Sequence, residues 1–169
     1  MKCGIVIYPS KALQDEINSL RKRYDPEYAL IEPHITLKTR FDIDDNLLSQ
    51  LIDELNEITK DTEPFDINIK KASTFQPVSN KIYFKIEPNQ SLQKLHARLY
   101  EGILPKEKFS TFVPHITIAQ DLNTDEFADV YTMLSMKDYN YTDTINSLQI
   151  TYELDDGTWD VYKNFNFGG

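Results

Sequence analysis

Two near-identical segments hold the residues of this chain that could do chemistry. Pro33-His34-Ile35-Thr36-Leu37 recurs about half a chain length later as Pro114-His115-Ile116-Thr117-Ile118, and the pair contains two of the three histidines. Residues two apart on a β-strand point to the same face, so each segment places an imidazole beside a hydroxyl. A repeat at half-length predicts a two-lobed fold built from two copies of one unit. If the two strands face each other, both imidazoles and both hydroxyls converge on one point.

Such a convergent set suits the cleavage of a phosphodiester without a metal. One neutral histidine takes a proton from the attacking oxygen, and the other, protonated, gives a proton to the leaving oxygen. Hydroxyls donate hydrogen bonds to the non-bridging phosphate oxygens, where negative charge must be stabilised. We therefore predict that His34 and His115 are catalytic and that Thr36 and Thr117 bind the substrate.

Basic residues near the motifs extend the predicted site. Lys38 and Arg40 have the same parity as the first motif's histidine and threonine, so on a regular strand they would bring positive charge near the phosphate. Lys81, Tyr83 and Lys85 share a face that could line the same cleft, or could be a solvated sheet edge. The loops expected to set specificity are 24–33, 76–80 and 105–112.

The motif also has structural and metal-binding interpretations. One His-x-Thr on a strand is commonly structural, but two copies kept for packing alone would not need histidine. A metal site usually needs three or four protein ligands, and no His-x-x-x-His, Cys-x-x-Cys or dense Asp/His cluster is present. We therefore expect no metal and no cofactor. The alternative function is a non-catalytic module that binds a nucleotide or phosphate ligand; RNA end ligation lacks a visible nucleotide-activation motif.

Composition limits the partners. The 169 residues carry a formal net charge of −9 with a pI of about 4.8, which argues against coating duplex nucleic acid. This charge is compatible with a small phosphate ligand held in a local basic pocket. The single cysteine, Cys3, indicates a reducing compartment, and no apolar stretch could span a bilayer. The sequence predicts a cytoplasmic protein without a membrane partner and leaves the oligomeric state open.

Hydrophobic periodicity predicts alternating strands and helices. The expected strands are 3–8, 34–41, 65–70, 81–86, 113–119, 141–154 and 158–167, and the expected helices are 10–23, 44–58, one from 91, and 124–136. Both motif strands follow a helix and a proline-bearing loop, and both precede another helix. This order predicts a duplicated α+β unit. Because no linker or low-complexity stretch divides the chain, we expect one bilobal domain over residues 1–169.

The two segments resemble the signature of the two-histidine (2H) phosphoesterase superfamily. Its members carry two His-x-Thr/Ser-x motifs with x apolar, and here these read His34-Ile35-Thr36-Leu37 and His115-Ile116-Thr117-Ile118. The approach Phe112-Val113-Pro114-His115 is also similar, and the short, acidic chain looks most like the YjcG-like branch. The resemblance implies an α+β fold in which two antiparallel sheets face a central cleft, with helices packed outside.

The resemblance also implies an activity. It is that of a hydrolase acting on cyclic or linear phosphoesters, often 2′,3′-cyclic nucleotides or RNA ends, without a metal. By that likeness His34 is the proton donor to the leaving oxygen, and His115 is the proton acceptor that activates water. Thr36 and Thr117 hold the phosphate. This chain is acidic overall, unlike superfamily members that act on RNA. The difference favours a small cyclic phosphate over a long RNA as the substrate.

Overall fold

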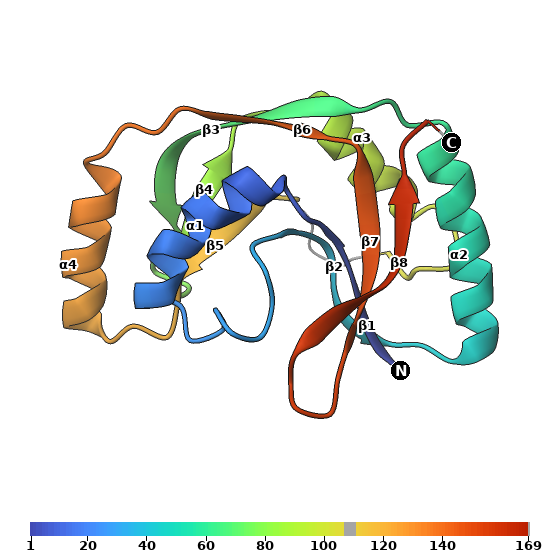
Figure 1. Cartoon of the computed structure of the whole chain (residues 1–169), viewed down its shortest axis with the longest axis horizontal. Coiled ribbons are helices and arrows are strands. Elements are labelled where there is room, and N and C mark those ends of the chain that lie inside the picture. The colour runs from blue at the N-terminus through green and yellow to red at the C-terminus, as the bar shows by residue number, and fades with distance from the viewer. Residues whose placement is uncertain (107–110, 169) are drawn as a thin grey trace.

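The computed structural model describes residues 1–106 and 111–168 and contains two four-stranded antiparallel sheets (Figure 1). The first sheet has the strand order β2-β1-β7-β8, and the second has the order β5-β4-β3-β6. The strands are β1 (Lys2–Ile7), β2 (Ile35–Asp42), β3 (Phe65–Thr74), β4 (Ile82–Ile86), β5 (His115–Ala119), β6 (Tyr141–Ile145), β7 (Ser147–Glu153) and β8 (Trp159–Asn166). The helices are α1 (Lys11–Tyr24), α2 (Asp45–Lys60), α3 (Gln90–Leu99) and α4 (Thr124–Ser135).

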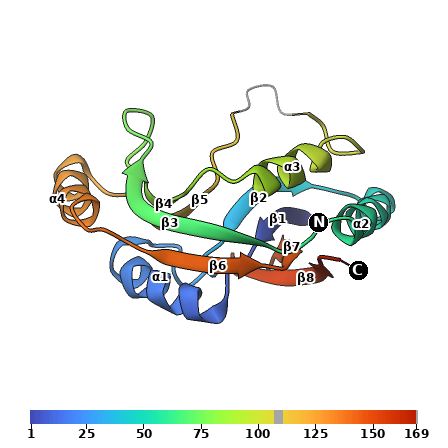
Figure 2. The same cartoon turned by 90° about the horizontal axis from the view of Figure 1, so that it is seen from above.

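The two sheets are built alike, as the repeated motif predicts. In each, the motif strand lies at one edge and pairs with the strand that precedes it in the chain, β1 beside β2 and β4 beside β5. A helix joins the two strands of each pair, α1 in one case and α3 in the other. The duplicated, bilobal α+β architecture is therefore confirmed, and α2 and α4 lie at opposite ends of the molecule (Figures 1 and 2).

Each connecting helix reaches across to the other sheet. Helix α1 packs against β5, the motif strand of the second sheet. The residue that ends α3, Tyr100, donates its hydroxyl hydrogen to the backbone carbonyl of Leu37 on β2 at 3.0 Å. The motif strands β2 and β5 also contact each other. This exchange of helices holds the two motif strands together at the centre of the molecule.

The helices form where capping and apolar spacing agree. Ser10 and Asp44 accept hydrogen bonds from the backbone three residues ahead, which caps α1 and α2. The buried stripe of α2 has helical spacing and consists of Leu48, Leu51, Leu55 and Ile58. One hydrophobic cluster contains residues of both sheets, among them Ile5 and Phe84. Among the described helices, none is both long and apolar enough to cross a membrane.

One predicted strand is longer in the structure, because β3 extends to Thr74 rather than ending at Lys70, and another is divided in two. The single strand expected over 141–154 is two strands, because the chain leaves the second sheet at Asn146 and enters the first. The apolar positions change parity between Ile145 and Leu148, a signal of the break that the prediction of a single strand overlooked. Helix α4 is capped by Asn123, which forms a reciprocal capping box with Glu126.

Candidate active site

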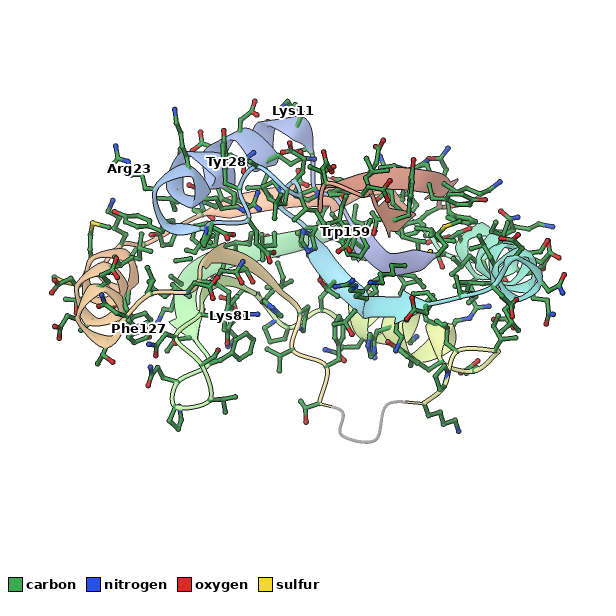
Figure 3. All side chains as sticks on the ribbon, turned by 90° about the horizontal axis from the view of Figure 1, so that it is seen from below. Lys11, Arg23, Tyr28, Lys81, Phe127 and Trp159 are labelled. Atoms are coloured by element: carbon green, nitrogen blue, oxygen red, sulfur yellow. The ribbon has the colours of Figure 1, made fainter. Side chains whose placement is uncertain are left out.

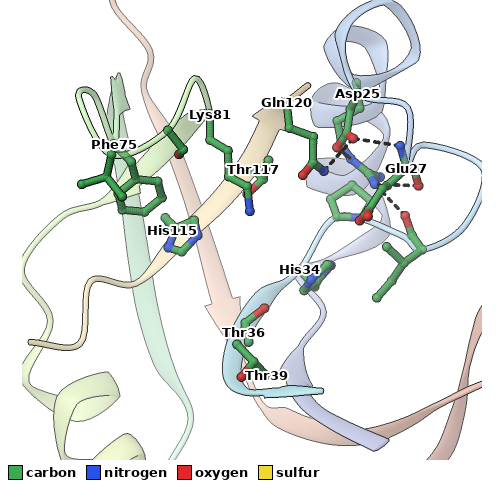
Figure 4. A pocket seen from close by; sticks show the side chains of 15 residues that line it. Asp25, Glu27, His34, Thr36, Thr39, Phe75, Lys81, His115, Thr117 and Gln120 are labelled. Atoms are coloured by element: carbon green, nitrogen blue, oxygen red, sulfur yellow. Dashed lines mark hydrogen bonds and ion pairs between the residues drawn. The ribbon is translucent and has the colours of Figure 1, made fainter. Parts of the chain in front are cut away.

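The two motifs line one cavity between the sheets (Figure 4). Its volume is about 420 Å³, and His34, Thr36, His115 and Thr117 all contribute to its wall. The predicted strand pattern explains this convergence. Ile35 and Leu37 are buried on one face of β2 and Ile116 and Ile118 on one face of β5, which leaves the histidines and threonines to the other. The structure thus brings together the four residues that the repeat singles out.

Both histidines are held by the same backbone contact. Nδ1 of His34 lies 2.8 Å from the carbonyl oxygen of Glu32, and Nδ1 of His115 lies 2.7 Å from that of Val113. A carbonyl oxygen only accepts, so each Nδ1 carries the hydrogen. Each neutral ring therefore keeps its lone pair on Nε2. That atom accepts a proton in the neutral form and donates one in the imidazolium form, so either ring can serve as base or acid.

The surroundings disfavour charge on both rings. The pKa of His34 is lowered to about 4, mainly by burial, with Arg21 and His115 acting in the same direction and the Glu32 carbonyl opposing them. Burial also lowers the pKa of His115, with Lys81 adding to the effect. Both imidazoles are thus neutral at pH 7 in the free protein. An anionic phosphate between them would favour the protonated form of one.

Aromatic side chains hold each imidazole at its edges. Phe75 and Tyr83 pack on each other at 4.4 Å, and the ring centroid of each lies 5.0 Å from that of His115. Tyr8 meets His34 edge-on at 6.3 Å. Apolar ring edges of this kind fix the orientation of the imidazole and exclude water from its flanks. The His115 side is the more enclosed of the two by aromatic groups.

The hydroxyls of Thr36 and Thr117 are available to a ligand. Within the described part of the chain, neither side chain hydrogen-bonds to another group. Thr39 joins them in the cavity wall although simple alternation would turn it away. The register explains this, because Val6 pairs with Thr36 while Ile5 pairs with Lys38, so β2 carries one extra residue at position 37.

Register shifts on both sides of Lys38 move the two basic residues predicted on this strand. Lys38 and Arg40 belong to the wall of a second cavity, which adjoins the first and shares His34 and Thr36 with it. The ammonium of Lys38 lies 5.8 Å from the ring centroids of both Phe41 and Tyr100. Arg40 forms a 3.0 Å ion pair with Glu153. Regular alternation thus ends before these residues. The positive charge of the central cavity comes from another residue.

Lys81 supplies positive charge to the central cavity. It lies just before β4, lines the cavity and is exposed, and Figure 4 shows its amine directed toward Thr117 and His115. Across the described ranges it forms no ion pair. Of the three hairpin residues considered from sequence, Lys81 lines the cavity wall, Tyr83 packs on His115, and Lys85 is exposed.

A buried ion pair organises the loop that leads to His34. The side chains of Arg21 and Asp25 are each 2% exposed, with Nε of the arginine 3.2 Å from the carboxylate. Arg21 also donates to the backbone carbonyl of Ile31 at 2.7 Å and to that of Glu27 at 3.4 Å. The other carboxylate oxygen of Asp25 accepts from Gln120, just beyond β5, at 2.8 Å. One network therefore fixes the loop before the first motif to the end of the second motif strand.

Sequence reasoning missed this network, although a signal was present. Leu13, Ile17 and Arg21 are spaced four apart on the buried stripe of α1, and Asp25 follows four residues later. A charged residue in register with a core stripe, followed by an opposite charge at that interval, predicts a buried pair. Gln120 gave no signal of its own. Of the loops expected to set specificity, 24–33 and 76–80 contribute to the cavity, and part of 105–112 lies outside the described residues.

No cluster of three or more His, Cys, Asp or Glu side chains suited to a metal ion occurs among residues 1–106 and 111–168. The donors that do converge are two imidazoles, hydroxyls and an ammonium, a set that matches a phosphate anion.

The model of one known family matches most of the chain. It is described as the 2′-5′ RNA ligase superfamily and matches residues 9–157. The chain belongs to this superfamily of two-histidine phosphoesterases. A superfamily relative from Oceanobacillus iheyensis, which bears the name "Putative phosphoesterase", is 52% identical over 168 residues and aligns over 99% of both chains. Another with that name, from Geobacillus, is 46% identical over 169 residues, with 100% of this chain and 98% of the relative aligned.

Solved structures share the superfamily fold at low sequence identity. LigT of E. coli in complex with 3′-AMP aligns with a TM-score of 0.76 and 14% identity, over 99% of this chain and 98% of that one. TT0787 of Thermus thermophilus aligns with a TM-score of 0.75 and 12% identity, over 100% and 99%. These likenesses confirm the bilobal α+β fold with sheets around a central cleft.

Proposed function

We propose that this protein is a metal-independent phosphoesterase that hydrolyses a cyclic or linear phosphodiester with His115 as base and His34 as acid. One observation carries the proposal: both histidines are fixed through Nδ1 and line the same cavity as two unengaged threonine hydroxyls. Membership of a superfamily that contains phosphoesterases supports it. So does the nucleotide bound by LigT, a protein of the same fold.

The reaction divides among the residues as follows. Nε2 of His115 takes a proton from water, whose oxygen forms the new bond to phosphorus. The bond from phosphorus to the leaving oxygen breaks, and that oxygen receives the proton carried by Nε2 of His34. Thr36, Thr117 and Lys81 face the non-bridging oxygens, where negative charge builds up. Before the next turnover, His115 gives its proton to solvent and His34 takes one up from solvent.

The name of the superfamily raises a second reaction for the same groups. If the 5′-hydroxyl of an RNA replaces water, the same proton transfers join it to a 2′,3′-cyclic phosphate and open the ring. This transfer exchanges one phosphoester bond for another, so it needs no nucleotide-activation motif. The acidic chain, with its net charge of −9, favours hydrolysis of a small ester over the joining of two long RNAs. Placement in the YjcG-like branch and a cytoplasmic location stay predictions.

An end-point assay tests the proposal. Wild type and the His34→Ala/His115→Ala double variant are incubated, with EDTA present, with 2′,3′-cyclic nucleotides, an RNA bearing a 2′,3′-cyclic end with and without a 5′-hydroxyl RNA, and ADP-ribose 1″,2″-cyclic phosphate. Turnover by the wild type alone, undiminished by EDTA, is expected. Loss of turnover with EDTA would refute metal independence. Saturable binding without any turnover would instead establish a non-catalytic binding module.

A further inference from the structure

The second cavity opens beside the first and has features that catalysis does not use. Its volume is about 270 Å³, and the wall that it shares with the central cavity consists of Glu27, Ile31, His34, Thr36 and Thr39. Its far wall comes from β1, β7 and β8 of the first sheet and includes Trp159, the first residue of β8 (Figure 3). A group attached to a phosphate on its His34 side would enter this space.

Trp159 is held in place through its backbone and its ring. Its amide donates to the carbonyl of Leu30 at 2.8 Å, which ties β8 to the loop that precedes His34. A Cβ built on Gly4 would lie 3.7 Å from the indole and 3.3 Å from the Thr151 hydroxyl. Glycine inside a strand marks a close approach of another group. Here it lets the indole pack closely onto β1, while the side chain remains partly exposed to the cavity.

The charges around Trp159 are balanced. Lys38 and Arg40 are offset by Glu27 and Glu153 in the same wall, and Arg40 is already paired with Glu153 at 3.0 Å. The wall therefore carries no net positive charge that would attract a second phosphate. An aromatic surface beside both donors and acceptors instead suits a base with its sugar. The base stacks on the ring, and the sugar hydroxyls and base amino groups have carboxylate acceptors nearby.

We propose that this second cavity is a nucleoside subsite, with Trp159 as the surface on which the base stacks. This assignment rests on the proposed function, and it narrows the substrate to phosphoesters whose leaving oxygen, the one that His34 protonates, belongs to a nucleoside. A 2′,3′-cyclic nucleotide and a cyclic RNA end both satisfy this condition. A cyclic phosphate without a base would be turned over slowly, because it leaves the second cavity empty.

The single tryptophan of the chain provides a test that does not depend on turnover. Uridine 3′-monophosphate is titrated into wild type while the tryptophan fluorescence is recorded, with inorganic phosphate as the comparison. Stacking predicts saturable quenching by the nucleotide and none by phosphate alone. The same titration of Tyr162→Ala, an exposed aromatic of β8 outside the cavity wall, should give the wild-type result.

A kinetic comparison completes the test. Wild type should prefer uridine 2′,3′-cyclic phosphate over glycerol 1,2-cyclic phosphate in kcat/KM by on the order of tenfold or more. Trp159→Ala should lose this preference and keep the wild-type rate with the glycerol ester. Trp159→Phe should retain most of the preference, because a phenyl ring also stacks. Thermal melts verify that each variant is folded.

The outcomes separate the two claims. Quenching by the nucleotide without turnover of either ester would support the subsite and refute the proposed phosphoesterase activity. Turnover with an unchanged preference in Trp159→Ala and no quenching in wild type would overturn the subsite and leave the phosphoesterase standing. Absence of both signals would overturn both.

Discussion

The side-chain amide of Gln120 donates a 2.8 Å hydrogen bond to Asp25, and this bond joins the two halves of the site. Asp25 ends α1 and is paired with Arg21, which holds the loop that leads to His34. Gln120 follows directly after β5, the strand that begins with His115. The relative position of the two imidazoles therefore depends on a contact outside both motifs.

Gln120→Ala should harm catalysis more than folding. Loss of one ordinary hydrogen bond lowers the free energy of unfolding by about 1 kcal/mol, whereas misplacement of one histidine relative to the other should lower kcat/KM by about tenfold or more. Denaturant unfolding and steady-state kinetics measure the two effects. Gln14→Ala is the matched control, because it removes a similar amide bond, to the carbonyl of Pro9, away from the cavity. Equal losses of kcat/KM in both variants would show that Gln120 does not position the histidines.

Much of the fold and the centre of the site could be predicted from the sequence, because both depend on local patterns. The Pro-His-Ile-Thr repeat indicated the duplicated unit, and period-two alternation placed Thr36 beside His34 on one face. The sequence pattern fails to predict the structure where pairing between strands distant in the chain determines it. The bulge at position 37 follows from pairing with β1, and the break at Asn146 follows from which sheet each half joins. The bulge leaves no mark in the periodicity, whereas the break is marked only by a change of parity between Ile145 and Leu148.

The pH dependence of the reaction should reflect how small a fraction of His34, the general acid, is protonated in the free protein. Burial lowers the pKa of His34 to about 4 and lowers that of His115, so raising the pH above these values leaves the base neutral but removes the proton that the acid must donate. The profile of kcat/KM should therefore peak below about pH 6.5, the ordinary histidine pKa, and fall toward pH 8. The profile of kcat should peak at higher pH, since bound phosphate raises the pKa of the acid. A kcat/KM maximum above pH 7.5 would contradict this account.

Removal of either motif hydroxyl should slow the reaction and leave the fold intact. Thr36→Val and Thr117→Val keep the branched shape and lose only the donor to the phosphate. A hydrogen bond to a charged group contributes about 1.5–3 kcal/mol, so kcat/KM should fall by about 10–100-fold in each variant. Thr132→Val, on the exposed surface of α4, should behave as wild type. Wild-type kinetics in both motif variants would show that the hydroxyls do not touch the substrate.

Lys81→Met tests the cation of the central cavity. Loss of its charge-assisted contact with the phosphate should lower kcat/KM by about 10–100-fold. The lysine charge also no longer depresses the pKa of His115, so that pKa should rise. Kinetics and histidine proton chemical shifts across a pH titration measure the two effects. The comparison is Lys70→Met, an exposed lysine of β3 outside the cavity wall. An unchanged His115 titration would place the Lys81 ammonium away from the ring.

The most direct test of the two-histidine account compares how each histidine variant responds to the leaving group. The values of kcat/KM are measured for wild type, His34→Ala and His115→Ala with uridine 2′,3′-cyclic phosphate and with a nucleoside p-nitrophenyl phosphodiester, whose nitrophenolate departs without a proton. His115→Ala should lose orders of magnitude with both substrates. His34→Ala should lose as much with the cyclic phosphate and far less with the nitrophenyl ester, because only the cyclic substrate needs the acid. The reverse pattern would exchange the roles of the two residues, and wild-type rates in both variants would contradict the account altogether.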